Sequence, residues 1–242
     1  MTEVIPAIIP ESFDDLQDKM ARANGLTPLV QVDVCDGKFV PSKSWPYKND
    51  AGGGFQKLIH EDDGFPFWQS LDFEADLMIA HPENGGAEEW IHAGAKRIIL
   101  HIESSQDLLA FVKKLRAEYG YPQEAMVSVE IGIGINIDTD NAELAPFLEK
   151  DADGKSLADF VQCMGIAKIG YQHQEFDERV LDKIADLRAQ YPDLLISIDG
   201  GVNFDNAADL VDAGVNRLVS GSALYESDDM REAIEEMQQS VA

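Results

Sequence analysis

The sequence predicts an α/β chain folded as a (β/α)8 TIM barrel, with residues 1–242 forming one domain. Short apolar runs alternate with amphipathic segments along the whole chain, the pattern of a parallel sheet whose strands are connected by helices. The runs number about eight, which is the strand count of such a barrel. The competing fold is a doubly wound open sheet, but no Gly-x-Gly-x-x-Gly turn follows the first run, so the barrel is favoured.

The predicted strands are short runs rich in β-branched and other apolar residues, bounded by turn residues. They begin at Val4, Leu29, Phe73, Arg97, Met126, Phe160, Leu194 and Asn216. The sixth run is the longest and is predicted to continue to residue 169. Because a barrel site lies where the parallel strands end, the residues at the ends of these runs are the first candidates for function.

Helices are predicted between the runs, where apolar residues recur three and four positions apart. Ser12 is the expected N-cap of the first helix, since acidic residues follow in its first turn. Further helices are predicted over residues 105–118, 176–190, 205–213 and 228–239. Residues 38–71 break the alternation and are predicted to form an irregular insertion after the second strand, which serves as a lid, a subunit contact or an ordinary surface loop.

The composition excludes several classes of partner. The chain has 45 acidic against 19 basic residues, a net charge of −26 that is spread along its length, so neither nucleic acid nor an anionic membrane is an expected partner. No apolar run approaches the length of a membrane span. The chain begins directly in a strand pattern and has only two cysteines, Cys35 and Cys163, which predicts a reducing, cytoplasmic location without disulfides.

Two aspartates carry the predicted chemistry. Asp33 and Asp199 close the second and seventh apolar runs, and a closed sheet would bring these distant strand ends to one site. Facing carboxyl groups are suited to removing a proton from one side of a carbon atom and returning one to the other side. Asp36, which precedes Gly37, is instead predicted to cap a turn.

Glycine turns follow the seventh and eighth runs and predict a phosphate site. The pairs are Gly200-Gly201 and Gly221-Ser222, at the two strand ends where barrels commonly bind phosphate through backbone N–H groups. Such a site needs no lysine, which suits an acidic chain. Other polar residues expected near strand ends are Asp76, His101 and Asn136. His101 and His173 are predicted to make polar contacts rather than to ligate metal, because no two histidines have a ligand spacing.

Five motifs resemble those of the ribulose-phosphate 3-epimerase family, over essentially the whole chain. They are VDVCDGKFVP at 32–41, DLM at 76–78, GYQHQEF at 170–176, IDGGV at 198–202 and GSA at 221–223. The resemblance implies a barrel of the ribulose-phosphate-binding type and an epimerase that inverts a carbon next to the carbonyl of a ketose phosphate, through an enediolate. It implies that Asp33 and Asp199 are the two bases. The implied contacts of the small phosphorylated sugar are Met78, His101, Gly170, Gly200, Gly201, Gly221 and Ser222.

The departures from the family motifs lie at the metal site and in the phosphate loop. In the family two aspartates and two histidines hold a divalent metal, but here the histidine positions carry Gln31 and Asp76. The resulting set is Gln31, Asp33, Asp76 and Asp199, whose oxygen ligands favour Mn²⁺ or Mg²⁺ over Zn²⁺ or Fe²⁺. Without a cation, at least one of the crowded carboxyl groups must be protonated. No organic cofactor is predicted.

Three alternatives remain open at this point. One is a phosphosugar-binding barrel that has lost catalysis. Another is a Schiff-base aldolase acting through Lys168, although alternation along the sixth run predicts that this side chain points away from the barrel interior. The last is a partner-binding module that uses the aromatic residues of the insertion, which are otherwise expected to pack on the barrel or on a second subunit of a homo-oligomer. These residues are Trp45, Phe65, Phe67 and Trp68.

Overall fold

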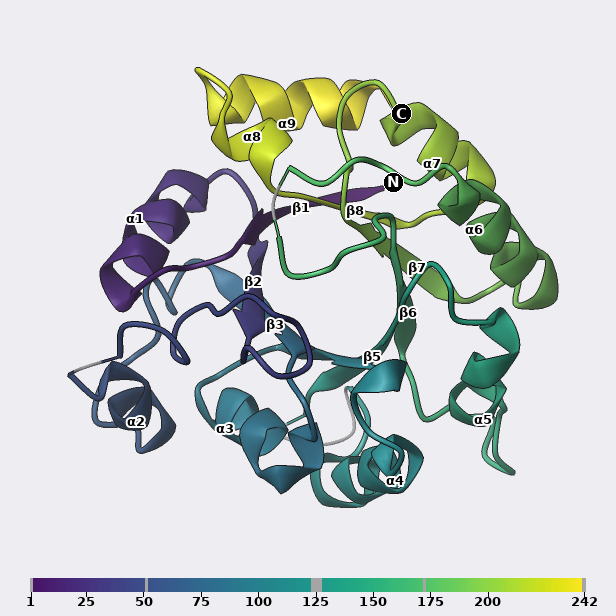
Figure 1. The fold of residues 1–242 in the computed structure, drawn as a ribbon, viewed down its shortest axis with the longest axis horizontal. Coiled ribbons are helices and arrows are strands. Elements are labelled where there is room, and N and C mark those ends of the chain that lie inside the picture. The colour runs from purple at the N-terminus through teal and green to yellow at the C-terminus, as the bar shows by residue number, and fades with distance from the viewer. Residues whose placement is uncertain (1, 51, 123–127, 172, 241–242) are drawn as a thin grey trace.

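The computed structural model describes residues 2–50, 52–122, 128–171 and 173–240, and its centre is a closed barrel of parallel strands (Figure 1). Each strand pairs with the next in sequence, and β1 closes the barrel on β8. The strands are β1 (Glu3–Ile8), β2 (Leu29–Cys35), β3 (Asp72–Met78), β4 (Arg97–His101), β5 (Glu130–Ile135), β6 (Phe160–Met164), β7 (Leu195–Asp199) and β8 (Arg217–Ser220). The predicted barrel is therefore confirmed.

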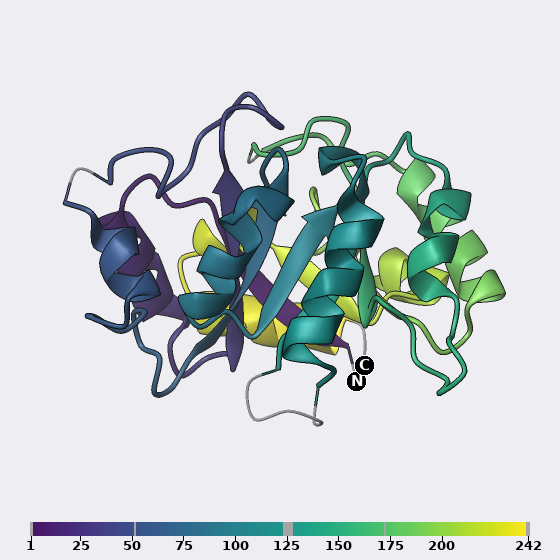
Figure 2. The ribbon, with the colours of Figure 1, turned by 90° about the horizontal axis from the view of Figure 1, so that it is seen from below.

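Helices surround the barrel on its outer side (Figures 1 and 2). They are α1 (Phe13–Ala23), α2 (Gly54–Ile59), α3 (Gly86–His92), α4 (Leu108–Tyr119), α5 (Ala145–Leu148), α6 (Arg179–Gln190), α7 (Ala207–Ala213), α8 (Ser222–Tyr225) and α9 (Met230–Gln239). Ser12 caps α1 as predicted, because its hydroxyl oxygen accepts the N–H of Asp15 at 3.2 Å. None of the helices in these described ranges is both long enough and apolar enough to cross a membrane.

Two strand boundaries differ from the prediction or cannot be compared with it. β6 ends at Met164 rather than at residue 169, because Gly165 turns the chain: its N–H donates to the carbonyl of Asp199 at 2.7 Å. A Cβ atom at Gly165 would lie 2.5 Å from the carbonyl oxygen of Gly200, so this close approach requires glycine. The predicted start of the fifth strand at Met126 lies outside the described residues, and β5 begins at Glu130.

The insertion at residues 38–71 contains the short helix α2 and packs against the barrel. The ring of Trp45 is fully buried, with its centroid 6.0 Å from that of Trp90 in α3. Phe65 stacks on Phe73 of β3 with centroids 3.7 Å apart. These contacts match the expectation that the aromatic residues pack on the barrel, whereas Trp68 is 65% exposed.

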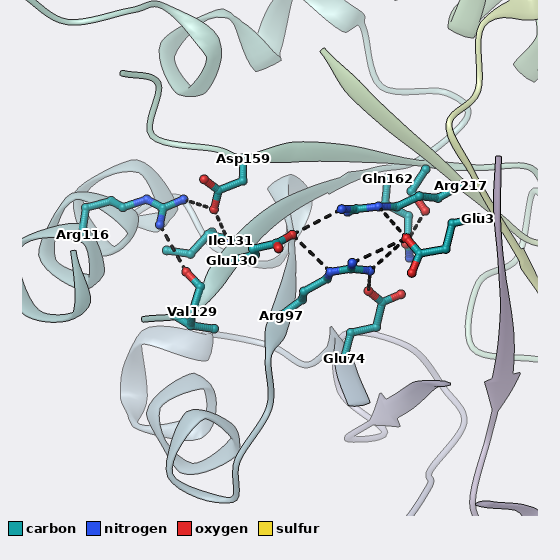
Figure 3. A network of polar contacts seen from close by, with 11 residues as sticks. Glu3, Glu74, Arg97, Arg116, Val129, Glu130, Ile131, Asp159, Gln162 and Arg217 are labelled. Carbon is teal, nitrogen blue, oxygen red and sulfur yellow. Dashed lines mark hydrogen bonds and ion pairs between the residues drawn. The ribbon is translucent and has the colours of Figure 1, made fainter. Parts of the chain in front are cut away.

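A charged network closes the N-terminal end of the barrel, and we call its five residues the barrel floor (Figure 3). Arg97 pairs with Glu74 at 3.2 Å, Glu130 at 3.1 Å and Glu3 at 3.5 Å. Arg217 pairs with Glu3 at 3.2 Å and Glu130 at 3.3 Å. Burial raises the pKa of Glu74 to about 7, although the two arginines oppose this shift. In a barrel, this end serves stability, while sites form at the opposite end.

Candidate active site

Three buried aspartates meet at the C-terminal end of the barrel, and we call them the aspartate cluster. Asp33 lies in β2, Asp76 lies beside it in β3, and Asp199 ends β7. Each offers a carboxylate oxygen within 4.8 Å of those of the other two. The closed sheet thus brings together the two aspartates that the sequence placed far apart, and Asp76 joins them.

The amide of Gln31 connects the two predicted bases. Its Nε2 donates to Oδ1 of Asp33 at 2.8 Å and to Oδ2 of Asp199 at 2.8 Å. Its Oε1 is buried and has no hydrogen-bond partner among the described residues. An amide can be turned by 180° at little cost in shape, which would direct this oxygen toward the carboxylates instead.

Asp76 is held by a different set of partners. Nε2 of His101 lies 2.8 Å from its Oδ1, and Nε2 of Gln162 donates to its Oδ2 at 3.4 Å. Burial lowers the pKa of His101, but the adjacent Asp76 outweighs burial and the net shift is upward. His101, expected to contact the sugar, therefore lies buried in an ion pair with Asp76. The residues that line the cavity do not include it.

The electrostatics of the aspartate cluster favour partial protonation. Burial raises the pKa of Asp33, and the nearby charges of Asp199 and Asp76 raise it further. Burial and Asp76 raise the pKa of Asp199 to about 7, while the hydrogen bond from Gln31 and the charge of His101 oppose the shift. A carboxyl group that titrates near neutral pH can act both as an acid and as a base.

A cavity of about 410 Å³ opens above Asp33 and Asp199. Apolar side chains form part of its wall near the aspartates, and the loops after β6, β7 and β8 form its rim. Of the residues predicted to contact the sugar, the lining includes Met78, Gly170, Gly200, Gly201, Gly221 and Ser222. A cavity with a mainly apolar wall and a few converging polar groups is typical of a small-molecule site.

The glycine turns of the rim have the backbone that the sequence predicts. Gly200 and Gly201 have φ values of 102° and 72°, in the region that glycine adopts most easily. A Cβ atom at Gly201 would lie 3.0 Å from the backbone of Phe176. Gly221 and Ser222 open α8, where the first N–H groups lack partners within the helix. These backbone groups are therefore suited to an anion.

Two rim residues form a contact that the sequence did not reveal. His173, in the loop after β6, lies with its Nε2 2.5 Å from Oε1 of Glu226, which directly follows α8. Both side chains line the cavity. The sequence drew attention to His173 but gave no signal for Glu226, because their 53-residue separation hides the pairing.

Lys168 does not belong to this site in the described structure. The side chain is exposed, and the residues that line the cavity do not include it. The alternation argument for its direction does not apply, because β6 ends four residues earlier at Met164. Its exposure nevertheless agrees with the expectation that it points away from the barrel interior.

Comparison with curated proteins gives one consistent family. The chain is 27% identical over 243 residues to ribulose-phosphate 3-epimerase of Bacillus subtilis, covering 98% of each chain. It is 29% identical over 211 residues to the enzyme of the same name from Chlamydia pneumoniae, covering 84% of this chain and 78% of that one.

Comparison with solved structures supports the fold. KGPDC from Streptococcus mutans, solved in complex with D-ribose 5-phosphate, superposes with a TM-score of 0.69 at 12% identity, covering 99% of this chain and 97% of that one. Residues 3–225 match the description of the ribulose-phosphate 3 epimerase family. This protein therefore belongs to the ribulose-phosphate 3 epimerase family.

Proposed function

We propose that this protein inverts a carbon next to the carbonyl of a ketose phosphate by two-base proton transfer. The observation that carries the proposal is the pair Asp33 and Asp199, which share the amide of Gln31 and both line the cavity. Membership in an epimerase family supports the reaction type. The S. mutans relative in fold, solved with D-ribose 5-phosphate, supports a phosphosugar as the ligand class.

In this mechanism one aspartate is ionised and the other protonated at the start of each turnover. The ionised carboxylate removes the proton from the carbon, leaving an enediolate, and the protonated carboxyl then delivers its proton to the opposite face. The protonation states of the two aspartates are thereby exchanged, so the next turnover can run in the reverse direction. A pKa of about 7 at Asp199 suits this alternation near neutral pH.

The donor set also fits a hard divalent cation, and we propose Mn²⁺ or Mg²⁺ in preference to Zn²⁺ or Fe²⁺. The carboxylate oxygens of the aspartate cluster lie close enough to surround one ion, and the partnerless Oε1 of Gln31 is a further oxygen ligand once the amide is turned. The residues holding it would be Gln31, Asp33, Asp76 and Asp199. When bound, such an ion would stabilise the negative charge of the enediolate.

The backbone of the rim would hold the phosphate group of the sugar. Gly200, Gly201, Gly221 and Ser222 line the cavity on the side of the loops after β7 and β8. Met78 and Gly170 would contact the rest of the sugar. In this assignment His101 acts through Asp76, as a positioning residue rather than as a sugar contact.

Turnover assays with D-ribulose 5-phosphate and other ketose phosphates, each in the presence of Mn²⁺, test the proposal. We expect epimerisation of at least one ketose phosphate by the wild-type protein and its loss in Asp33→Asn. A protein that binds these sugars but converts none of them would instead be the non-catalytic binding barrel, which the replacement of both metal-ligand histidines favours.

A further inference from the structure

The cavity contains an unusual balance of charge for a site that takes an anion. Three acidic side chains line it: Asp33, Asp199 and Glu226. Among the described lining residues, His173 is the sole side chain that can carry a positive charge. A phosphate monoester would bring up to two further negative charges. Backbone N–H groups bind such a group but do not cancel the repulsion from Glu226, so His173 is the natural counter-charge.

The position of His173 is defined by the backbone and by Glu226. Its φ is 58°, a left-handed conformation that only a few per cent of non-glycine residues adopt. The contact at 2.5 Å joins the loop after β6 to the residue that ends α8, the helix that begins with Ser222. The imidazole therefore lies at the rim, on the side of the glycine turns, with one ring nitrogen directed to the carboxylate.

We propose that His173 recognises the phosphate group of the ligand, with Glu226 orienting its ring. A protonated imidazole has two N–H donors, and Glu226 accepts from Nε2. The second donor, at Nδ1, would then bind a phosphate oxygen seated on the turns at Gly200 and Gly221. Such charge-assisted hydrogen bonds are stronger than those of neutral donors. The inference deepens the proposed function, on which it rests for the nature of the ligand.

The pair makes a prediction that a purely structural contact would not. If the pair only fastened the two loops together, removing either partner would weaken anion binding to a similar extent. If His173 binds phosphate, its loss must weaken binding, whereas neutralising Glu226 removes a repulsive charge and leaves the imidazole in place. The two substitutions should therefore act in opposite directions.

The experiment is a titration of the full-length protein with inorganic phosphate at pH 6.0, where an ordinary imidazole is mostly protonated. Binding is followed through the amide NMR signals of Gly221 and Ser222. For His173→Gln we expect the dissociation constant to rise about tenfold, the loss of one charge-assisted hydrogen bond. For Glu226→Gln we expect it to stay equal or to fall. Equal weakening by both substitutions, or no effect of His173→Gln, would overturn the inference.

The matched control is His60→Gln, which removes an exposed imidazole directly after α2, outside the cavity lining. Its phosphate affinity should equal that of the wild type, and a tenfold loss there would overturn the inference as well. These measurements require no turnover. If no ketose phosphate is epimerised but the opposite effects appear, the proposed function fails and the phosphate contact stands. In an active enzyme, His173→Gln should raise KM by a larger factor than it lowers kcat.

Discussion

The two ends of the barrel interior both bury carboxyl groups, but they compensate the charge differently. At the barrel floor, three glutamates face two arginines in a connected network (Figure 3). At the aspartate cluster, three carboxyl groups face one imidazole and two amides. Buried charge without a partner is costly, so an end that leaves it uncompensated is explained by function rather than by stability.

The pKa values express the same contrast. Glu74, Asp33 and Asp199 all have raised pKa values because of burial. At the floor, arginine charges oppose the shift, whereas at the cluster the neighbouring aspartates add to it. The floor is therefore one charge away from balance, and the cluster needs a proton, a cation or both. Substitutions at the two ends should separate activity from stability.

The largest expected effect is on activity, from Asp199→Asn. We expect kcat to fall about a thousandfold, since a general acid or base contributes roughly 10² to 10⁴ and asparagine cannot exchange the proton. The side chain keeps its shape and can still accept the hydrogen bond from Gln31, so the circular dichroism spectrum should match the wild type. Steady-state kinetics measure the change, and retention of wild-type kcat would break the contrast.

At the other end, Arg97→Met should act on stability. The substitution leaves Glu74 buried without its closest cation, and breaking a buried pair costs about 3 to 5 kcal/mol. Urea unfolding at pH 8 measures it. The double variant Arg97→Met, Glu74→Leu should recover part of the loss because it removes the stranded charge. We expect kcat of the folded single variant to remain close to that of the wild type; a thousandfold decrease would contradict the division of roles.

Glu74→Gln should show a pH-dependent gain in stability. The pKa of Glu74 is raised to about 7 in the folded protein from an ordinary 4.5, so its contribution to stability is full below pH 4.5 and is lost as pH rises to 7. Glutamine is neutral throughout. Relative to the wild type, the variant should therefore gain about 2 kcal/mol between pH 5 and pH 8. Urea unfolding at both pH values checks this, and a constant difference would refute it.

Mn²⁺ should stabilise the aspartate cluster. With metal-stripped protein, saturating Mn²⁺ should raise Tm by about 5 °C, the shift expected from a ligand well above its Kd. Asp76→Asn should lose most of this shift, because a proposed ligand charge is removed. Asp72→Asn, at the exposed start of the same strand β3, is the matched control and should keep it. No shift with the wild type would exclude the proposed cation site.

The smallest effect is expected for Lys168→Ala, which should leave kcat and KM within about twofold of the wild type, as for an exposed residue away from the site. Borohydride treatment of the wild type with a ketose phosphate should trap no covalent adduct. A trapped adduct at Lys168 would instead support the aldolase alternative and move the chemistry away from the aspartates.

The barrel and the position of its site follow from local patterns in the sequence. Alternating runs fix the strand order, and a barrel places strand ends such as Asp33 and Asp199 around one axis, so their convergence could be predicted. The end of β6 could not, because it depends on the close approach of Gly165 to Gly200, a contact between two distant turns.

Contacts between side chains on different strands were also beyond the sequence. Nothing in the sequence indicates that Gln31 donates to both carboxylates, or that His101 pairs with Asp76 and so lies away from the cavity lining. The pair His173 and Glu226 likewise depends on how two loops approach each other. Such contacts arise from three-dimensional packing, which residue spacing along one strand does not encode.

The most direct test of the two-base account is hydrogen exchange during turnover in D₂O. With D-ribulose 5-phosphate, the wild-type protein should introduce deuterium at C3 in both epimers, as NMR would show. Asp33→Asn and Asp199→Asn should each exchange at most one epimer and invert neither, because each keeps a single base. Inversion that survives either substitution, or that occurs without deuterium at C3, would contradict the account.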